Sequence, residues 1–321
     1  MAIEFGISTA GVDDIAEQAR RLERLGFDFL GIGEHISFNQ PVASPLVALG
    51  AAAAVTSRIQ LMTAILLAPI YPAALLAKMG ATLDHISGGR FHLGVGVGGE
   101  NPAEIEACGV SMRERGRRAD DTLDIVRRLW TEENVDHDGD YATLRGITIS
   151  PRPVQRPHPP IWVSGRKDAA LRRAARVGDG WLPYMFSPEM IRDSLDRLKP
   201  LCDEYGRDPA SISSGALVFT SCHEDPRIAR DRALQRLAEQ YDQDFSAILD
   251  RYVAHGTPDR VQARIREYID AGVQTLIIGP ACPDEFTAEH EELLATEVLP
   301  ALRPHREPAA DATGHGVEDR F

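Results

Sequence analysis

Three short segments of this 321-residue chain combine residue types that can do chemistry. In Gly33-Glu34-His35, a histidine follows an apolar run, where it can exchange a proton near neutral pH, contact an aromatic cofactor or simply pack. The glycine-dense stretch from Gly94 to Asn101 allows a ligand to approach the backbone, or makes only a turn. Ser164-Gly165-Arg166-Lys167 opens a predicted helix. With Ser164 at the N-cap, free N–H groups and two cations, it suits either a phosphate or an ordinary helix start.

The cysteines and histidines predict no metal site. The four cysteines lie far apart without a Cys-x-x-Cys pair, and no histidines cluster at metal-ligand spacing. We therefore expect free thiols in a reducing compartment rather than a disulfide framework. These cysteines are Cys108, Cys202, Cys222 and Cys282.

A charged run lies between the second and third of these segments. The arginines from Arg113 to Arg118 are followed by Asp120, Asp121 and Asp124 at helical spacing. Opposite charges three or four positions apart pair on one helix. We therefore expect a solvated, ion-paired helix face here rather than a basic ligand site.

The overall charge argues against two classes of partner. The chain has 35 basic and 48 acidic residues, a net charge of −13 at pH 7, and 43% hydrophobic residues. A nucleic-acid or membrane-surface binder needs a basic face, whereas a local pocket for an anion remains compatible with this balance. No apolar run reaches 18 residues, and the first residues lack the basic region of a signal peptide. We expect a cytoplasmic protein.

Short apolar runs alternate with longer amphipathic runs along the whole chain, and this alternation must position the segments above. Eight strand-and-helix units predict a parallel sheet closed into a (β/α)8 TIM barrel. A doubly wound sheet is the competing fold, but no GxGxxG follows the first strand. The predicted strands are residues 3–8, 29–33, 59–67, 91–97, 161–163, 180–184, 213–220 and 273–279.

We expect one barrel domain over residues 1–303, with the irregular stretch 132–150 inserted between the fourth and fifth strands. A helical stretch is predicted from Arg227 to Leu249, and the polar tail 304–321 is expected to be disordered. In such a barrel, function collects in the loops at the carboxyl ends of the strands, where all three segments fall. The apolar run 59–67 by itself indicates only a buried strand.

Together these segments resemble the luciferase-like monooxygenase superfamily, whose members are flavin- or deazaflavin-dependent barrels of the bacterial-luciferase type. The resemblance covers most of residues 3–300. Its most specific part is SRIQLMTAILLAPIYPAALLAKMGATLDHISGGRFHLGVGVGG, from Ser57 to Gly99. Further matches are Gly33-Glu34-His35, PRPVQRPHPPIWVSG from Pro151 to Gly165, and RRAARVGDGWLP from Arg172 to Pro183.

The resemblance implies a role for each segment. A non-proline cis peptide in the third strand would bulge against the cofactor ring, the glycine-dense loop would line the cofactor cleft, and the loop after the fifth strand would bind the cofactor phosphate. His35 would lie by the reactive ring carbon and assist hydride transfer, and the insertion 132–150 would lie near the cleft. The implied cofactor-binding positions are Ala64 and Ile65 at the cis peptide, Val97, Gly98, Ser164, Gly165 and Arg166.

The sequence of these segments is most similar to the branch of the superfamily that uses the deazaflavin coenzyme F420. This implies hydride exchange between F420 and a small organic substrate without oxygen activation. The alternative cofactor is FMN, reduced by a separate reductase and then reacting with oxygen to oxygenate the substrate. A second alternative is a non-catalytic subunit with the luciferase fold. The family also implies a homodimer.

Two positions depart from the sugar-phosphate dehydrogenases of this superfamily. Where those enzymes carry a catalytic glutamate, this chain has Gly99, with Glu100 one residue further on. Where they carry a tryptophan beside the histidine, this chain has Asn39. We therefore expect a substrate other than glucose 6-phosphate, and a partly apolar pocket to which the insertion and residues 184–186 contribute.

Overall fold

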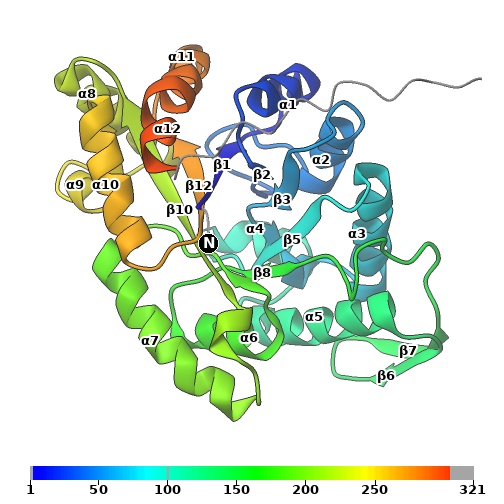
Figure 1. The fold of residues 1–321 in the computed structure, drawn as a ribbon. Coiled ribbons are helices and arrows are strands. Elements are labelled where there is room, and N and C mark those ends of the chain that lie inside the picture. Colours follow the sequence, from blue (N-terminus) through cyan, green and yellow to red (C-terminus); the bar gives the residue numbers. More distant parts are fainter. Residues whose placement is uncertain (1–2, 100, 304–321) are drawn as a thin grey trace, which may run out of the picture.

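The computed structural model describes residues 3–99 and 101–303, which form a closed barrel of parallel strands surrounded by helices (Figure 1). The strands follow the order β10-β12-β1-β2-β3-β5-β8-β9, and β9 pairs again with β10. The predicted (β/α)8 barrel is confirmed. The barrel strands are β1 (Glu4–Thr9), β2 (Phe29–Ile32), β3 (Gln60–Thr63), β5 (Phe91–Gly96), β8 (Ile161–Val163), β9 (Gly180–Trp181), β10 (Ser213–Cys222) and β12 (Thr275–Pro280).

The helices around the barrel bury an apolar face, and several of them start with a capping side chain or a proline in the first turn. In α7, Ser187 accepts a hydrogen bond from the Met190 N–H, and Pro188 occupies the first turn. In α5, the buried Trp130 donates its indole N–H to the Ala77 carbonyl of α3 at 2.8 Å. These helices are α1 (Ile15–Arg24), α2 (Pro45–Ala53), α3 (Ala73–Ser87), α5 (Arg115–Thr131), α6 (Asp168–Val177), α7 (Pro188–Glu204), α8 (Pro226–Tyr241), α10 (Pro258–Asp270) and α11 (Thr287–Leu293).

Large side chains fill the inside of the barrel. Trp162 donates its indole N–H to His92 at 3.1 Å, and burial lowers the pKa of His92 to about 4. Because the interior is packed, ligand binding is confined to the loops at the strand ends. The cluster that fills the interior consists of Phe29, Met62, Ala64, Trp162, Leu182 and Ile277.

The predicted strand 59–67 is divided by a cis peptide between Ala64 and Ile65. The first part is β3, and the second is the two-residue strand β4 (Leu66–Leu67), which pairs with β5. The cis geometry that the resemblance implied at this position is therefore present.

The region after β10 also differs from the sequence prediction. The helix expected to reach Leu249 ends at Tyr241, because Asp242 takes a left-handed conformation with φ of 49°. The short helix α9 (Leu249–Tyr252) and the strand β11 (Val253–Gly256), which pairs with β10, then follow. Four residues carry too little alternation for a strand to be predicted. The tail 304–321 lies outside the described residues, and none of the described helices is long and apolar enough to cross a membrane.

The insertion 132–150 forms an antiparallel hairpin of β6 (Val135–Asp138) and β7 (Thr143–Ile147). Figure 1 shows this hairpin on the outer side of α5, with the helix between it and the barrel strands. His137 of β6 contacts Asp121 of α5 at 2.8 Å, and the Arg118 guanidinium lies over the Tyr141 ring. The expectation that this insertion lies near the cleft and contributes to the pocket is therefore wrong.

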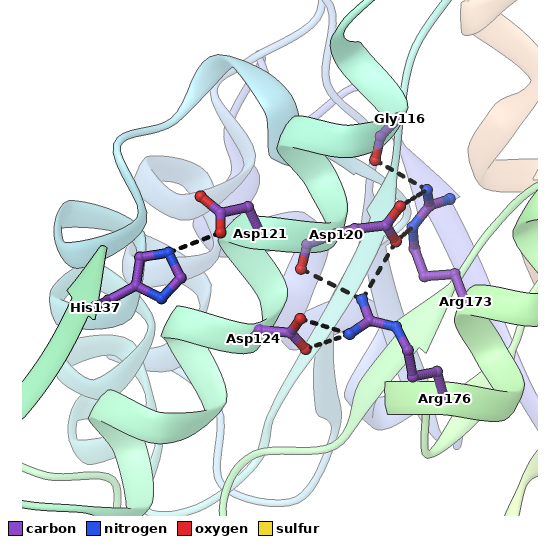
Figure 2. A network of polar contacts seen from close by, with 7 residues as sticks. All are labelled: Gly116, Asp120, Asp121, Asp124, His137, Arg173 and Arg176. Atoms are coloured by element: carbon purple, nitrogen blue, oxygen red, sulfur yellow. Dashed lines mark hydrogen bonds and ion pairs between the residues drawn. The ribbon is translucent and has the colours of Figure 1, made fainter. Parts of the chain in front are cut away.

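The aspartates of α5 contact side chains of neighbouring elements (Figure 2). Asp120 accepts a hydrogen bond from Arg173 Nε at 2.7 Å, and Asp124 accepts one from Arg176 Nη1 at 2.6 Å. Both arginines lie on α6, so the charges join two neighbouring helices rather than forming the expected solvated face on one helix. Sequence spacing reveals pairs within a helix but cannot reveal pairs between helices.

Candidate active site

The sequence-predicted segments meet at one edge of the barrel. Strands β2, β3, β5 and β8 are consecutive neighbours, so the loops at their carboxyl ends lie side by side. The structure thus brings together residues 33–35, 64–65, 97–98 and 164–166. Glu100 lies outside the described residues.

The cis peptide places the Ile65 side chain against the glycine-dense strand β5. A Cβ atom at Gly96 would lie 2.4 Å from Ile65 Cδ1, so this strand needs glycine where Ile65 crosses it. Ile65 itself is half-buried, whereas Ala64 is 8% exposed. The Ala64–Ile65 unit therefore forms an apolar part of the barrel edge where Ile65 keeps some accessible surface.

Glu34 ties the end of β2 to the chain just after the cis peptide. Its buried carboxylate accepts the Leu67 N–H at 2.7 Å and the Tyr71 hydroxyl. Burial raises the pKa of Glu34, and the two hydrogen bonds oppose that shift. Burial and the nearby Glu34 also raise the pKa of Tyr71. Glu34 is thus a structural anchor for the two neighbouring loops.

His35 is held by a carboxylate that the sequence analysis missed. Its Nδ1 lies 3.3 Å from both oxygens of Glu104, which is 1% exposed, while the His35 side chain is 22% exposed. Glu104 also accepts the N–H groups of Ile36 at 3.0 Å and Ser37 at 3.4 Å. A carboxylate beside Nδ1 favours the tautomer with a proton there, which leaves Nε2 as the nitrogen that exchanges protons.

Glu104 lies on α4 (Pro102–Ala107), a helix that was not predicted. Asn101 caps it by accepting the Ala103 N–H at 3.1 Å, and Pro102 occupies its first turn. An Asn-Pro pair with an acidic residue in the first turn is a helix-start pattern, so the signal was present in the sequence. The pairing with His35 had no such signal, because 69 residues separate the two.

The loop between β5 and α4 is shaped by Gly98, whose φ is 67°. Glycine adopts this left-handed backbone conformation without strain, whereas a residue with a side chain would be strained. The Gly98 carbonyl accepts a hydrogen bond from Arg115 Nε at 3.2 Å, which fixes this loop to the start of α5. Val97 is half-buried and packs against the main core. Val97 and Gly98 therefore lie next to the Ala64–Ile65 unit, where they could line a binding site.

The loop after β8 presents a hydroxyl and cations next to each other. Ser164 is 8% exposed and its N–H donates to Val95, while the Gly165 carbonyl accepts the Trp181 indole N–H at 3.1 Å. The exposed Arg166 lies over the Tyr184 ring. The N-cap of α6 is Lys167, not Ser164 as expected, because three further residues separate Ser164 from the first helical turn.

The described residues therefore combine, at one barrel edge, a partly exposed imidazole, a partly exposed apolar unit and a hydroxyl with a neighbouring guanidinium. The first can exchange a proton, the second can support a flat ring, and the third can bind an anion. No three side chains of His, Cys, Asp or Glu are grouped as a metal site within the described ranges. In their chemistry, these groups together suit an anionic aromatic cofactor.

Comparisons with known proteins identify the family and the fold that this chain shares. The sequence model of a family described as luciferase-like monooxygenase matches residues 3–275. An F420-dependent glucose-6-phosphate dehydrogenase of Intrasporangium calvum is 26% identical over 327 residues, which cover 91% of this chain and 96% of that relative.

Two solved structures share the fold. A monooxygenase from Streptomyces bottropensis is 28% identical with a TM-score of 0.80, covering 93% of this chain and 99% of its own. An F420-dependent secondary alcohol dehydrogenase, solved with an F420–acetone adduct, is 22% identical with a TM-score of 0.82, covering 95% of this chain and 100% of its own.

Proposed function

The chain belongs to the luciferase-like monooxygenase family, and on that premise we propose that it is an F420-dependent oxidoreductase acting on a small organic substrate. The observation that carries the proposal is the imidazole of His35, which is partly exposed and held at Nδ1 by the buried Glu104. The likeness to an F420-dependent dehydrogenase over 91% of the chain supports this choice of cofactor.

The residues at the barrel edge fit an anionic deazaflavin in their chemistry. The Ser164 hydroxyl, the Gly165 N–H and the Arg166 guanidinium offer donors and charge for a phosphate, while Ile65 offers an apolar surface for a ring. Val97 and Gly98, which follow β5, lie between the Ala64–Ile65 unit and the Ser164 loop and would line the same site. When bound, F420 supplies a ring carbon that exchanges a hydride with an organic molecule.

In this proposal, the protein's own contribution is to hold and move one proton. The Glu104 carboxylate keeps the His35 ring oriented through Nδ1, and Nε2 takes the proton of a substrate hydroxyl or returns it to a carbonyl oxygen. Positioned proton transfer of this kind contributes about 10²–10⁴-fold to a rate. Glu34 acts indirectly, by holding the loop on which His35 stands.

The test is equilibrium binding of oxidised F420 and, separately, of oxidised and reduced FMN, followed by quenching of cofactor fluorescence and by thermal shift. We expect F420 to bind in the micromolar range or tighter and FMN much more weakly. Arg166→Gln should weaken F420 binding about tenfold, because the cation pairs with the phosphate. Arg172→Gln is the matched control, because its side chain is exposed on α6, the helix that follows Arg166, and pairs with Glu204.

A preference for FMN would assign the chain to the flavin-dependent monooxygenases instead. The 28% identity to the Streptomyces monooxygenase favours oxygenation as this second candidate reaction. The next assay would then be oxygen uptake with a separate flavin reductase. Failure of both cofactors to bind would indicate a non-catalytic subunit and overturn the proposal.

We also propose that the protein is a cytoplasmic homodimer. The four cysteines are unpaired and Cys108 is exposed, a state that persists in a reducing compartment. Light scattering after gel filtration should give twice the chain mass of 35.2 kDa. A mass of one chain would contradict the dimer and leave the proposed reaction untouched.

A further inference from the structure

A row of aromatic rings starts at His35 and continues across the end of the barrel. The Phe38 ring stacks on the His35 imidazole, with centroids 3.9 Å apart and planes within 7°. Tyr241 meets the edge of Phe38 at 6.0 Å, and it contacts Phe219 at 6.2 Å and Phe245 at 5.7 Å. The row thus joins the loop after β2 to the end of α8, and we call it the aromatic row.

The loop that carries Phe38 is anchored on both sides. Toward α4, Asn101 Nδ2 donates to the Ser37 carbonyl at 3.1 Å. Toward α8, Asn39 Nδ2 donates to the Gln240 carbonyl at 3.2 Å, and Arg236 Nη1 donates to Gln40 at 2.9 Å. Phe38 is therefore fixed in place, and its ring is part of a preformed surface.

The aromatic row stands on a second apolar cluster, separate from the main core. Phe219 and Phe245 are buried in it, whereas Phe38, Tyr184 and Tyr241 are half-buried and keep part of their surface accessible. Buried rings beneath and accessible rings above make a surface suited to another flat apolar group. This surface directly adjoins the imidazole to which proton transfer is assigned.

The charges around the aromatic row disfavour an anion. The buried carboxylate of Glu104 lies directly behind His35, and Glu34 is the preceding residue. Of the arginines beside these rings, Arg166 lies over Tyr184 and is assigned to the cofactor phosphate, while two others are engaged by neighbouring side chains. Arg236 pairs with Asp284 at 3.0 Å, and Arg232 lies over the Phe286 ring at 3.6 Å.

We propose that Phe38 and Tyr241 select the substrate, and that the substrate is an uncharged molecule whose reacting group is attached to an aromatic or other planar apolar ring. A sugar phosphate does not match this surface. The inference deepens the proposed function, on which the reaction itself rests. Binding of the substrate ring depends only on the aromatic row.

The experiment is calorimetric titration of two probes, 2-acetonaphthone and glucose 6-phosphate, into the protein with and without F420. We expect 2-acetonaphthone to bind and glucose 6-phosphate to bind at least tenfold more weakly. Phe38→Ala and Tyr241→Ala should each raise the Kd of 2-acetonaphthone at least tenfold, while the Kd of F420 stays within twofold. Phe38→Leu keeps an apolar side chain and removes only the aromatic ring. We expect it to raise the Kd of 2-acetonaphthone by less than Phe38→Ala does.

Tyr205→Ala is the matched control, because Tyr205 is an accessible tyrosine at the end of α7, away from the aromatic row. It should leave both affinities unchanged. Tighter binding of glucose 6-phosphate than of the ketone, or a ketone affinity that ignores Phe38→Leu and Tyr241→Ala, would overturn the inference.

The two proposals fail separately. If the wild-type protein binds the ketone through Phe38 but binds no F420, the proposed function is wrong and the aromatic row keeps its role. If F420 binds and the ketone is indifferent to all three variants, the proposed function stands and the role of the aromatic row is wrong.

Discussion

His35 follows strand β2, and His290 on α11 packs against the carboxyl end of β10, yet their surroundings give them opposite properties. His35 is 22% exposed and touches a carboxylate through Nδ1. His290 is 1% exposed, and its Nδ1 accepts the Cys222 N–H at 3.2 Å while Nε2 lies 2.9 Å from the Thr220 hydroxyl. Burial lowers the pKa of His290 to about 4, so this ring stays neutral.

The comparison shows that position at the strand ends does not by itself make a histidine reactive. The backbone N–H at Nδ1 requires the His290 proton on Nε2, where the hydroxyl accepts it, so both nitrogens are occupied. At His35 the contact with Glu104 engages Nδ1, and no hydrogen bond to Nε2 is found among the described residues. We therefore expect changes at His35 to alter the reaction and changes at His290 to alter stability.

The sharpest way to break this comparison is His35→Ala. We expect kcat to fall about 10²–10⁴-fold, which corresponds to about 3–5 kcal/mol of transition-state stabilisation. The F420 Kd and the Tm should stay nearly constant, because His35 lies at the surface of the site. His137→Ala, at a histidine of similar exposure on the outer hairpin, should leave kcat unchanged. Lost cofactor binding with retained chemistry would show that the assigned role is wrong.

The converse change is His290→Ala, measured by urea unfolding. It leaves the Thr220 hydroxyl and the Cys222 N–H buried without their partner, so the free energy of unfolding should fall by about 3 kcal/mol. Activity per folded molecule should remain at the wild-type level. A large loss of kcat in fully folded protein would instead place His290 in the active site and remove the contrast.

The residue next to His290 extends the comparison to pH. Glu291 is fully buried against Arg21 of α1, and burial raises its pKa to about 7. A carboxyl whose pKa is higher in the folded than in the unfolded state contributes stability below its unfolded pKa of about 4.5, and that contribution is lost as the pH rises toward 7. This part of the molecule should therefore lose stability between pH 5 and 8.

Glu291→Gln removes that titration. The free energy of unfolding of the variant minus that of the wild type should increase by about 2 kcal/mol from pH 5 to pH 8. Urea unfolding of both proteins at several pH values measures it, and the contribution of His290 cancels in the difference. A difference that does not change with pH would mean that Glu291 is ionised throughout this range.

The contrast between the two histidines was only partly accessible from the sequence. The barrel could be predicted, because eight alternating units repeat a pattern that few folds satisfy. The resemblance placed His35 and the cis peptide at Ala64–Ile65 at strand ends, and the structure has both there. Their roles toward a cofactor stay predictions.

What the sequence did not reveal depends on contacts between distant segments. Glu104 reaches His35 across 69 residues, and the hairpin 132–150 packs on the outer side of α5 rather than at the site. His290 was not singled out, since its burial between α11 and β10 follows from packing and not from its neighbours in the chain. Spacing predicts elements well, but a side chain's partner and exposure require the assembled fold.

The variant with the smallest expected effect changes Glu104, the carboxylate that contacts His35 and has no counterpart at His290 among the described residues. Glu104→Gln keeps the volume and an acceptor for the Ile36 N–H but removes the charge beside His35. Charge-assisted hydrogen bonds exceed neutral ones by about 1.4 kcal/mol, so kcat should fall about tenfold while KM and the F420 Kd hold. Glu106→Gln, on the exposed side of the same helix, is the matched control. If KM rises and kcat is unchanged, Glu104 shapes the loop but does not orient the imidazole, and the difference between His35 and His290 reduces to exposure alone.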